Sequence, residues 1–82
     1  MGTKEKLIAR FLSKPKDFTY SELKRLLGFY SYTAEQVSGS RVVFVNKESG
    51  HKIKLHKPHP GNVLKRYQIE LIENELKYLD LL

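Results

Sequence analysis

Basic side chains and histidines gather in the middle of this 82-residue chain. Between Ser38 and Tyr67 there is one acidic residue, Glu48, whereas the basic residues are Arg41, Lys47, Lys52, Lys54, Lys57, Lys65 and Arg66. Lys and Arg bind phosphate groups through charge and hydrogen bonds. The segment therefore favours a polyanionic partner such as RNA. A solvated, lysine-rich surface without any partner would have the same composition.

The same segment holds the three histidines of the chain, His51, His56 and His59. His56 and His59 stand three residues apart in the run His-Lys-Pro-His-Pro-Gly-Asn, which its prolines stiffen. Imidazole has an unperturbed pKa near ~6.5 and can take or give a proton at neutral pH. His56 and His59 are therefore candidate catalytic groups, acting as general acid and base on a phosphodiester. The alternative is that both are inert surface histidines.

A metal site is not expected around these histidines. The chain has no cysteine, and no carboxylate lies near them in the sequence to complete a ligand set. Lys52, Lys54 and Lys57 would also repel a cation. The sequence has no glycine-rich phosphate loop. We therefore predict no metal and no cofactor.

The elements that must position these residues can be read from capping signals and apolar spacing. Thr3 and Thr19 are candidate helix caps, the second with Glu22 in a capping box, and Gly28 suits a left-handed helix end. The pattern predicts helices over residues 4–13, 19–28 and 65–79, and strands over 29–37, 41–46 and 51–57. This order predicts an α+β fold, α-α-β-β-β-α, with helices on one face of a three-stranded antiparallel sheet.

The third predicted strand alternates cleanly between apolar and basic residues. Ile53 and Leu55 point to the core, so Lys52, Lys54 and His56 point to the uncovered face. On the preceding strand Val42 and Phe44 make the better core pair, which leaves Arg41 on the uncovered face. Together these residues are predicted to form a phosphate-binding platform, with Tyr30 or Tyr32 beside it.

Length and composition limit the class of protein. A chain of 82 residues with net charge +6 holds one domain, residues 1–82, and buries only a thin core. Its apolar runs are too short for a membrane span, and residues 1–13 do not resemble a signal peptide. The lack of cysteine fits a cytoplasmic protein.

Two blocks of the sequence resemble the HicA toxins, mRNA interferases that pair with a HicB-type antitoxin. They are Gly-Ser-Arg-Val-Val-Phe over residues 39–44 and His-Lys-Pro-His-Pro-Gly-Asn-Val-Leu-Lys over residues 56–65. The resemblance covers residues 17–80, and residues 1–16 look like an added helix. It implies a core similar to double-stranded RNA-binding domains, an mRNA substrate and an antitoxin partner.

The chain departs from the family pattern at two adjacent positions. The family's catalytic histidine follows Gly-Ser, and here that residue is Arg41, followed by Val42 in place of a second histidine. Arginine stays protonated and cannot act as a base, but it can hold a phosphate and stabilise negative charge. The residues that we predict to bind RNA are Ser40, Arg41, Lys52, Lys54, Lys57 and Lys65.

Three functions therefore remain open from the sequence. The chain is an endoribonuclease toxin that uses His56 or His59, or a catalytically inactive module that binds RNA or an antitoxin. The third possibility is a stable domain whose basic face has no nucleic-acid partner.

Overall fold

The computed structural model describes residues 2–58 and 61–82 and confirms the predicted α+β class and element order. The elements are α1 (Thr3–Leu12), α2 (Tyr20–Gly28), β1 (Tyr32–Ser38), β2 (Arg41–Asn46), β3 (Lys52–His56) and α3 (Arg66–Tyr78). Within these described ranges, no helix has the length and apolar character that a membrane span requires.

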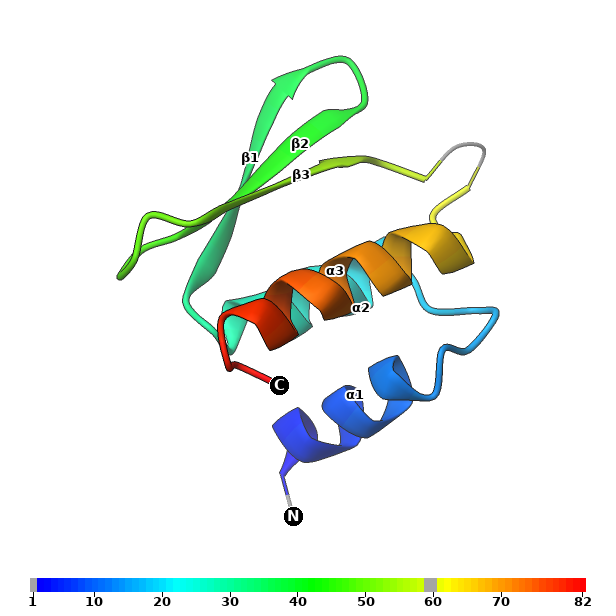
Figure 1. The fold of residues 1–82 in the computed structure, drawn as a ribbon. Helices are drawn as coiled ribbons and strands as arrows, with labels where there is room; N and C mark the ends of the chain where they lie inside the picture. The colour runs from blue at the N-terminus through cyan, green and yellow to red at the C-terminus, as the bar shows by residue number, and fades with distance from the viewer. Residues whose placement is uncertain (1, 59–60) are drawn as a thin grey trace.

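The three strands form one antiparallel sheet in the order β1-β2-β3, so each strand pairs with its neighbour in the chain. The helices lie on one side of this sheet, with α2 nearest β1 and α3 nearest β3 (Figure 1). The predicted alternation is confirmed, because the buried side chains of β2 and β3 are Val42, Phe44, Ile53 and Leu55. The opposite side of the sheet is left uncovered.

Helix α1 belongs to the same core as the other elements. Its inward residues Leu7 and Phe11 are buried, and the Phe11 ring meets Phe18 edge-on with centroids 5.4 Å apart. Arg10 Nε also donates to Glu22 Oε2 at 2.7 Å, which ties α1 to the start of α2. Helix α1, which lies outside the HicA-like region 17–80, thus contributes Leu7 and Phe11 to the hydrophobic core of the domain.

The start of α2 was correctly predicted, whereas the start of α1 and the end of α2 were not. Glu22 N donates to Thr19 Oγ1 at 3.1 Å, and Thr19 N donates to Glu22 Oε1 at 2.9 Å, which completes the capping box. Gly2, rather than Thr3, caps α1, and its amide donates to Glu5 Oε1 at 2.7 Å.

Gly28 does not take the left-handed conformation expected of it. It is the last residue of α2, and the hydrogen-bonded turns continue through Phe29 and Tyr30 before Ser31 reverses the chain with φ 70°. Because residues 29–31 form this turn, β1 begins at Tyr32 and not at Phe29.

Candidate nucleic-acid interface on the open face of the sheet

The uncovered side of the sheet, called the open face below, is defined by the strand register. Partners across β2 and β3 are Arg41 with His56, Val43 with Lys54, and Val45 with Lys52. From β1 the face receives Thr33 and Glu35, which lie opposite Val45 and Val43, and then Val37. The face thus combines the predicted basic residues and His56 with a strip of valines.

The hydrogen-bond ladder shows how closely Arg41 and His56 approach. Asn46 N donates to His51 O at 2.8 Å, and Lys57 N donates to Ser40 O at 2.7 Å. Hydrogen-bonded and non-hydrogen-bonded pairs alternate along antiparallel strands, so Arg41 and His56 form a non-hydrogen-bonded pair. In such pairs the Cα atoms are about 4.5 Å apart and the side chains are close neighbours.

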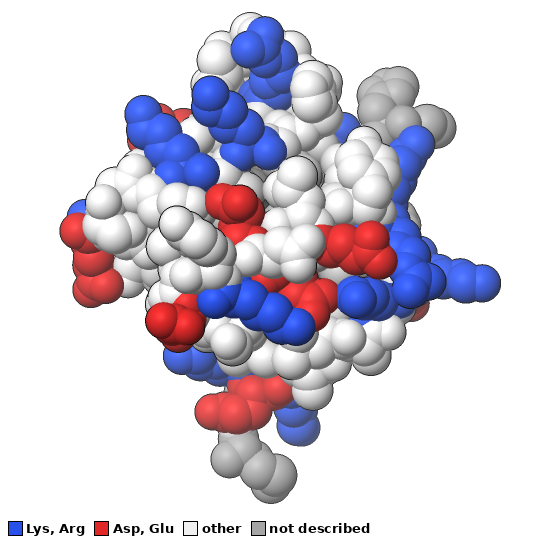
Figure 2. Space-filling view, viewed as in Figure 1, with Lys and Arg blue, Asp and Glu red and all other residues white. Residues whose placement is uncertain are grey.

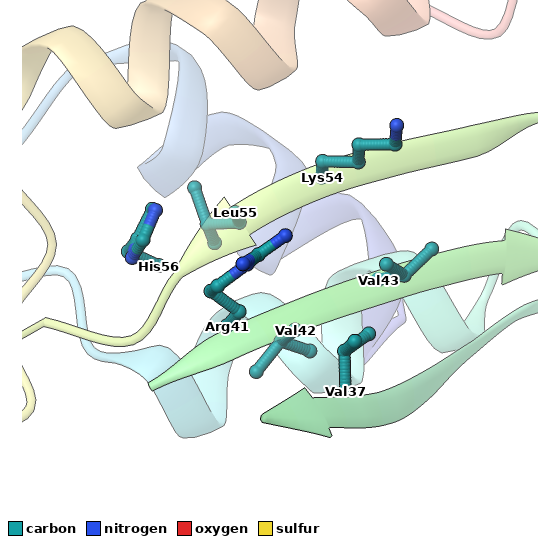
Figure 3. Close-up of a pocket in the computed structure, with 7 residues that line it drawn as sticks. All are labelled: Val37, Arg41, Val42, Val43, Lys54, Leu55 and His56. Carbon is teal, nitrogen blue, oxygen red and sulfur yellow. The ribbon is translucent and has the colours of Figure 1, made fainter. Parts of the chain in front are cut away.

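A pocket of about 460 Å³ opens at this end of the sheet. Figure 3 shows the Arg41 side chain reaching over the space between β2 and β3, with His56 on one side and Lys54 on the other. The pocket is lined by Val37, Arg41, Val42, Val43, Lys54, Leu55 and His56. An apolar floor beneath two cations and an imidazole suits a ligand that is anionic at one end and apolar at the other.

The remaining residues predicted to bind RNA lie elsewhere. Ser40 is exposed in the turn between β1 and β2, and Lys65 is exposed at the N-cap of α3. Lys57 lies on the helix side of the sheet, where its Nζ is 3.3 Å from Gln36 Oε1 and 5.8 Å from the centroid of the Tyr20 ring. His59 is outside the described residues. The structure thus groups Arg41, Lys52, Lys54 and His56 on one face and separates Lys57 from them.

The expectation of a tyrosine on the open face is wrong. Tyr32 belongs to the helix side of β1 and is buried, and Tyr30 packs against the core before the strand begins. The open face as described, from Thr33 across to His56, therefore carries no tyrosine, phenylalanine or tryptophan ring. The side chains on this surface that can stack on a base are therefore the His56 imidazole and the Arg41 guanidinium.

His51 serves the fold rather than the open face. Its Nδ1 lies 2.8 Å from the Tyr32 hydroxyl and its Nε2 lies 2.9 Å from Glu75 Oε1, so it joins β1 to α3. In contrast, His56 is exposed beside Arg41. Among the described residues, no group of three or more His, Asp or Glu side chains could hold a metal ion.

Gln68 is a supporting residue that sequence reasoning missed. It is buried in the first turn of α3, where its Nε2 donates to His56 O at 2.9 Å. Its Oε1 accepts from Lys65 N at 3.0 Å. One side chain therefore fixes the end of β3, and with it His56, to the start of α3. Only its position in an otherwise apolar helix stripe could have indicated a buried role.

The sheet and α3 differ in the charge of the side chains around them. Figure 2 shows Lys and Arg side chains over the upper part of the molecule, where the strands lie, and at its right edge. Acidic side chains lie mainly across the middle, at the level of α3 (Figures 1 and 2). The sheet end is thus the more positive part of this view, and it would attract a polyanion.

Comparison of the chain with protein families, with curated proteins and with solved structures found no match. The resemblance to HicA toxins therefore stays a prediction that depends on the two sequence blocks alone.

Proposed function

We propose that the protein binds RNA on the open face of its sheet and acts as a HicA-like mRNA interferase. The observation that carries the proposal is the direct pairing of Arg41 with His56, next to Lys54 and above an apolar pocket floor. This arrangement sets a fixed cation beside an imidazole, which can carry a proton, at an exposed site.

In the proposed reaction Arg41 and Lys54 hold the phosphate while His56 takes the proton of the adjacent 2′-hydroxyl. The 2′ oxygen then attacks phosphorus, and the bond from phosphorus to the 5′ oxygen breaks. The products are a 2′,3′-cyclic phosphate and a 5′-hydroxyl, which takes its proton from water or from His59. Arg41 lowers the barrier by stabilising the charge that develops on the phosphate oxygens.

The proposed partner that controls this activity is a HicB-type antitoxin in the same cytoplasm. Acidic side chains on such a protein would complement Arg41, Lys52 and Lys54 and would exclude RNA from the open face. Coexpression with the product of an adjacent HicB-like reading frame should then relieve toxicity.

Binding is tested by replacing one cation of the open face. Arg41→Ala should weaken binding to a labelled mRNA fragment and should lower the slope of log Kobs against log salt by about 1. Arg25→Ala, at an exposed arginine in the last turn of α2, is the matched control and should leave both quantities unchanged. If Arg41→Ala binds RNA as the unchanged protein does, the open face is not the RNA site.

Cleavage is tested at the histidines. His56→Ala should lower the rate of RNA cleavage by roughly 10²- to 10⁴-fold, as expected for loss of a general base, while RNA affinity changes little. His59→Ala is measured in parallel, and growth arrest on expression gives a second readout. If neither substitution slows cleavage or relieves growth arrest, the assignment of catalysis to these histidines is wrong.

A second candidate is an RNA- or antitoxin-binding module that cleaves nothing. It is favoured by Arg41 at the position of the family's catalytic histidine, and by His51 being held between Tyr32 and Glu75. Salt-dependent binding of labelled mRNA without cleavage products would establish this candidate and reject the interferase.

A further inference from the structure

The outer edge of β1 is an unpaired strand edge. In the described parts of the chain β1 pairs only with β2, and residues 34 to 38 are exposed. Sheet edges offer unpaired amides and carbonyls to any strand that approaches, and proteins usually protect them with lysine, proline or a covering loop. Residues 32–38 contain no lysine, arginine or proline, and their one charge is Glu35.

The ladder to β2 identifies which backbone groups point outward. Lys47 N donates to Ser31 O at 2.8 Å, so Ser31 directs its backbone groups toward β2. By alternation, Thr33 and Glu35 also face β2. The outward amides and carbonyls are therefore those of Tyr32, Ala34 and Gln36, a set that is symmetric about Ala34.

We propose that this edge binds a second copy of the chain, with the two β1 strands antiparallel about a two-fold axis at Ala34. In this register Ala34 faces Ala34 of the partner subunit, and Tyr32 faces Gln36 of the partner subunit. Each outward amide then meets an outward carbonyl. Two three-stranded sheets become one of six strands, with both open faces on the same side.

Side chains and charge favour this occupant. Alanine at the axis is small, so the strands can approach closely. Thr33 lies opposite Glu35 of the partner subunit, so no two like charges face each other. Ala34 and Gln36 belong to the helix side of the sheet and yet are exposed. The helices thus do not cover this half of β1, which leaves room for the second copy.

The short length of the β1–β1 contact limits the affinity of the dimer. The pairing of β1 with β2 shifts register between Gln36 and Ser38, so the regular edge ends at Gln36. Five residues from each copy give a contact below the ~1,200 Å² of standard interfaces. The dimer should therefore be weak and depend on protein concentration.

A single cysteine tests the axis, because the chain has none of its own. Across a two-fold axis Ala34→Cys places two thiols in a strand pair whose Cα spacing, about 5.5 Å, allows a disulfide. Mild oxidation should link Ala34→Cys rapidly into a dimer. Ser49→Cys, exposed in the turn between β2 and β3, is the matched control and should link slowly. Equal rates would overturn the proposal.

Charged substitutions of Thr33, which would lie opposite Glu35 of the partner subunit, test the register, and sedimentation measures the dimer. Thr33→Glu places two carboxylates opposite each other at two symmetric positions and should weaken dimerisation by roughly 2- to 30-fold. Thr33→Lys places an ammonium opposite the same carboxylate and should keep or strengthen the dimer. Thermal melts of both variants check that the monomer fold is retained. A monomer at every concentration, or equal weakening by both substitutions, would overturn the proposal.

Discussion

At the scale of single residues, Glu22 connects the first two helices. Its carboxylate accepts from Thr19 N within the capping box and from Arg10 Nε of α1 at 2.7 Å. The hydrogen bond from Arg10 is the main cause that lowers the pKa of Glu22 from 4.5 to about 2. The charged form of Glu22 therefore stabilises the folded protein.

This carboxylate should make stability depend on acid pH. The folded pKa lies below the unfolded value, so the contribution is complete above pH 4.5 and is lost as pH falls toward 2. Glu22→Gln should lower the free energy of unfolding at pH 7 by about 1 kcal/mol, with the difference vanishing near pH ~2.

Denaturant titrations at several pH values measure this difference. The control is Glu70→Gln, which removes an exposed helical ion pair with Arg66 and should change stability by less than ~0.5 kcal/mol. A difference between Glu22→Gln and the unchanged protein that stays constant from pH 7 to pH 2 would contradict the assigned role.

The sequence predicted part of this residue-scale chemistry. Thr19 and Glu22 are three residues apart, and local spacing alone defines a capping box. The contact with Arg10 spans 12 residues and depends on how α1 packs, which no local pattern encodes. For the same reason the sequence, which assigned His56 to the uncovered face by alternation, gave no sign that His51 is held between Tyr32 and Glu75.

At the scale of elements, Gln68 determines how β3 meets α3. The two hydrogen bonds of its side chain satisfy a carbonyl at the end of β3 and an amide at the start of α3. The connection between these elements includes the segment that carries His59. Gln68 thus holds the two sides of that segment together independently of the segment itself.

Loss of this side chain should destabilise the protein. Gln68→Ala leaves the His56 carbonyl and the Lys65 amide without their partner, and should lower the free energy of unfolding by about 1–3 kcal/mol. Asn74→Ala, exposed on the same helix, should have little effect. Urea unfolding of both variants provides the measurement, and equal stabilities would show that Gln68 does not link β3 to α3.

Sequence patterns predicted the elements better than their mutual register. Alternation assigned Lys52, Lys54 and His56 to the open face, because side chains of a strand change sides with period two. Tyr32 was misplaced because its side depends on how β1 pairs with β2, where Tyr32 lies opposite Asn46 and Ala34 opposite Phe44 on the helix side. The register shift near Val37 likewise depends on pairing between strands and has no signature in a single strand.

At the scale of the whole molecule, the net charge of +6 acts in opposite directions on the two proposed interactions. RNA binding releases counterions from phosphate, so salt weakens it. Dimerisation brings two cationic molecules together, so salt screens their repulsion and strengthens it.

Raising NaCl from about 50 to 200 mM should therefore change the two affinities in opposite senses. With three cations of the open face on phosphates, RNA affinity should fall by roughly 20- to 40-fold, whereas dimer affinity should rise slightly. Sedimentation for the dimer and anisotropy with labelled RNA measure the two effects in one buffer series. A dimer that dissociates with salt would contradict the assignment of its contact to backbone pairing.

The β3 edge of the sheet limits the size of any assembly that forms by strand pairing. The ladder directs the backbone groups of Lys52, Lys54 and His56 away from β2, and Gln68 already occupies the His56 carbonyl. Lysines on an edge strand oppose the docking of another strand. Once two β1 edges have joined, the unpaired edges of the six-stranded sheet are those of β3, which carry these lysines. Growth by strand addition therefore stops at a closed pair and does not continue into fibres.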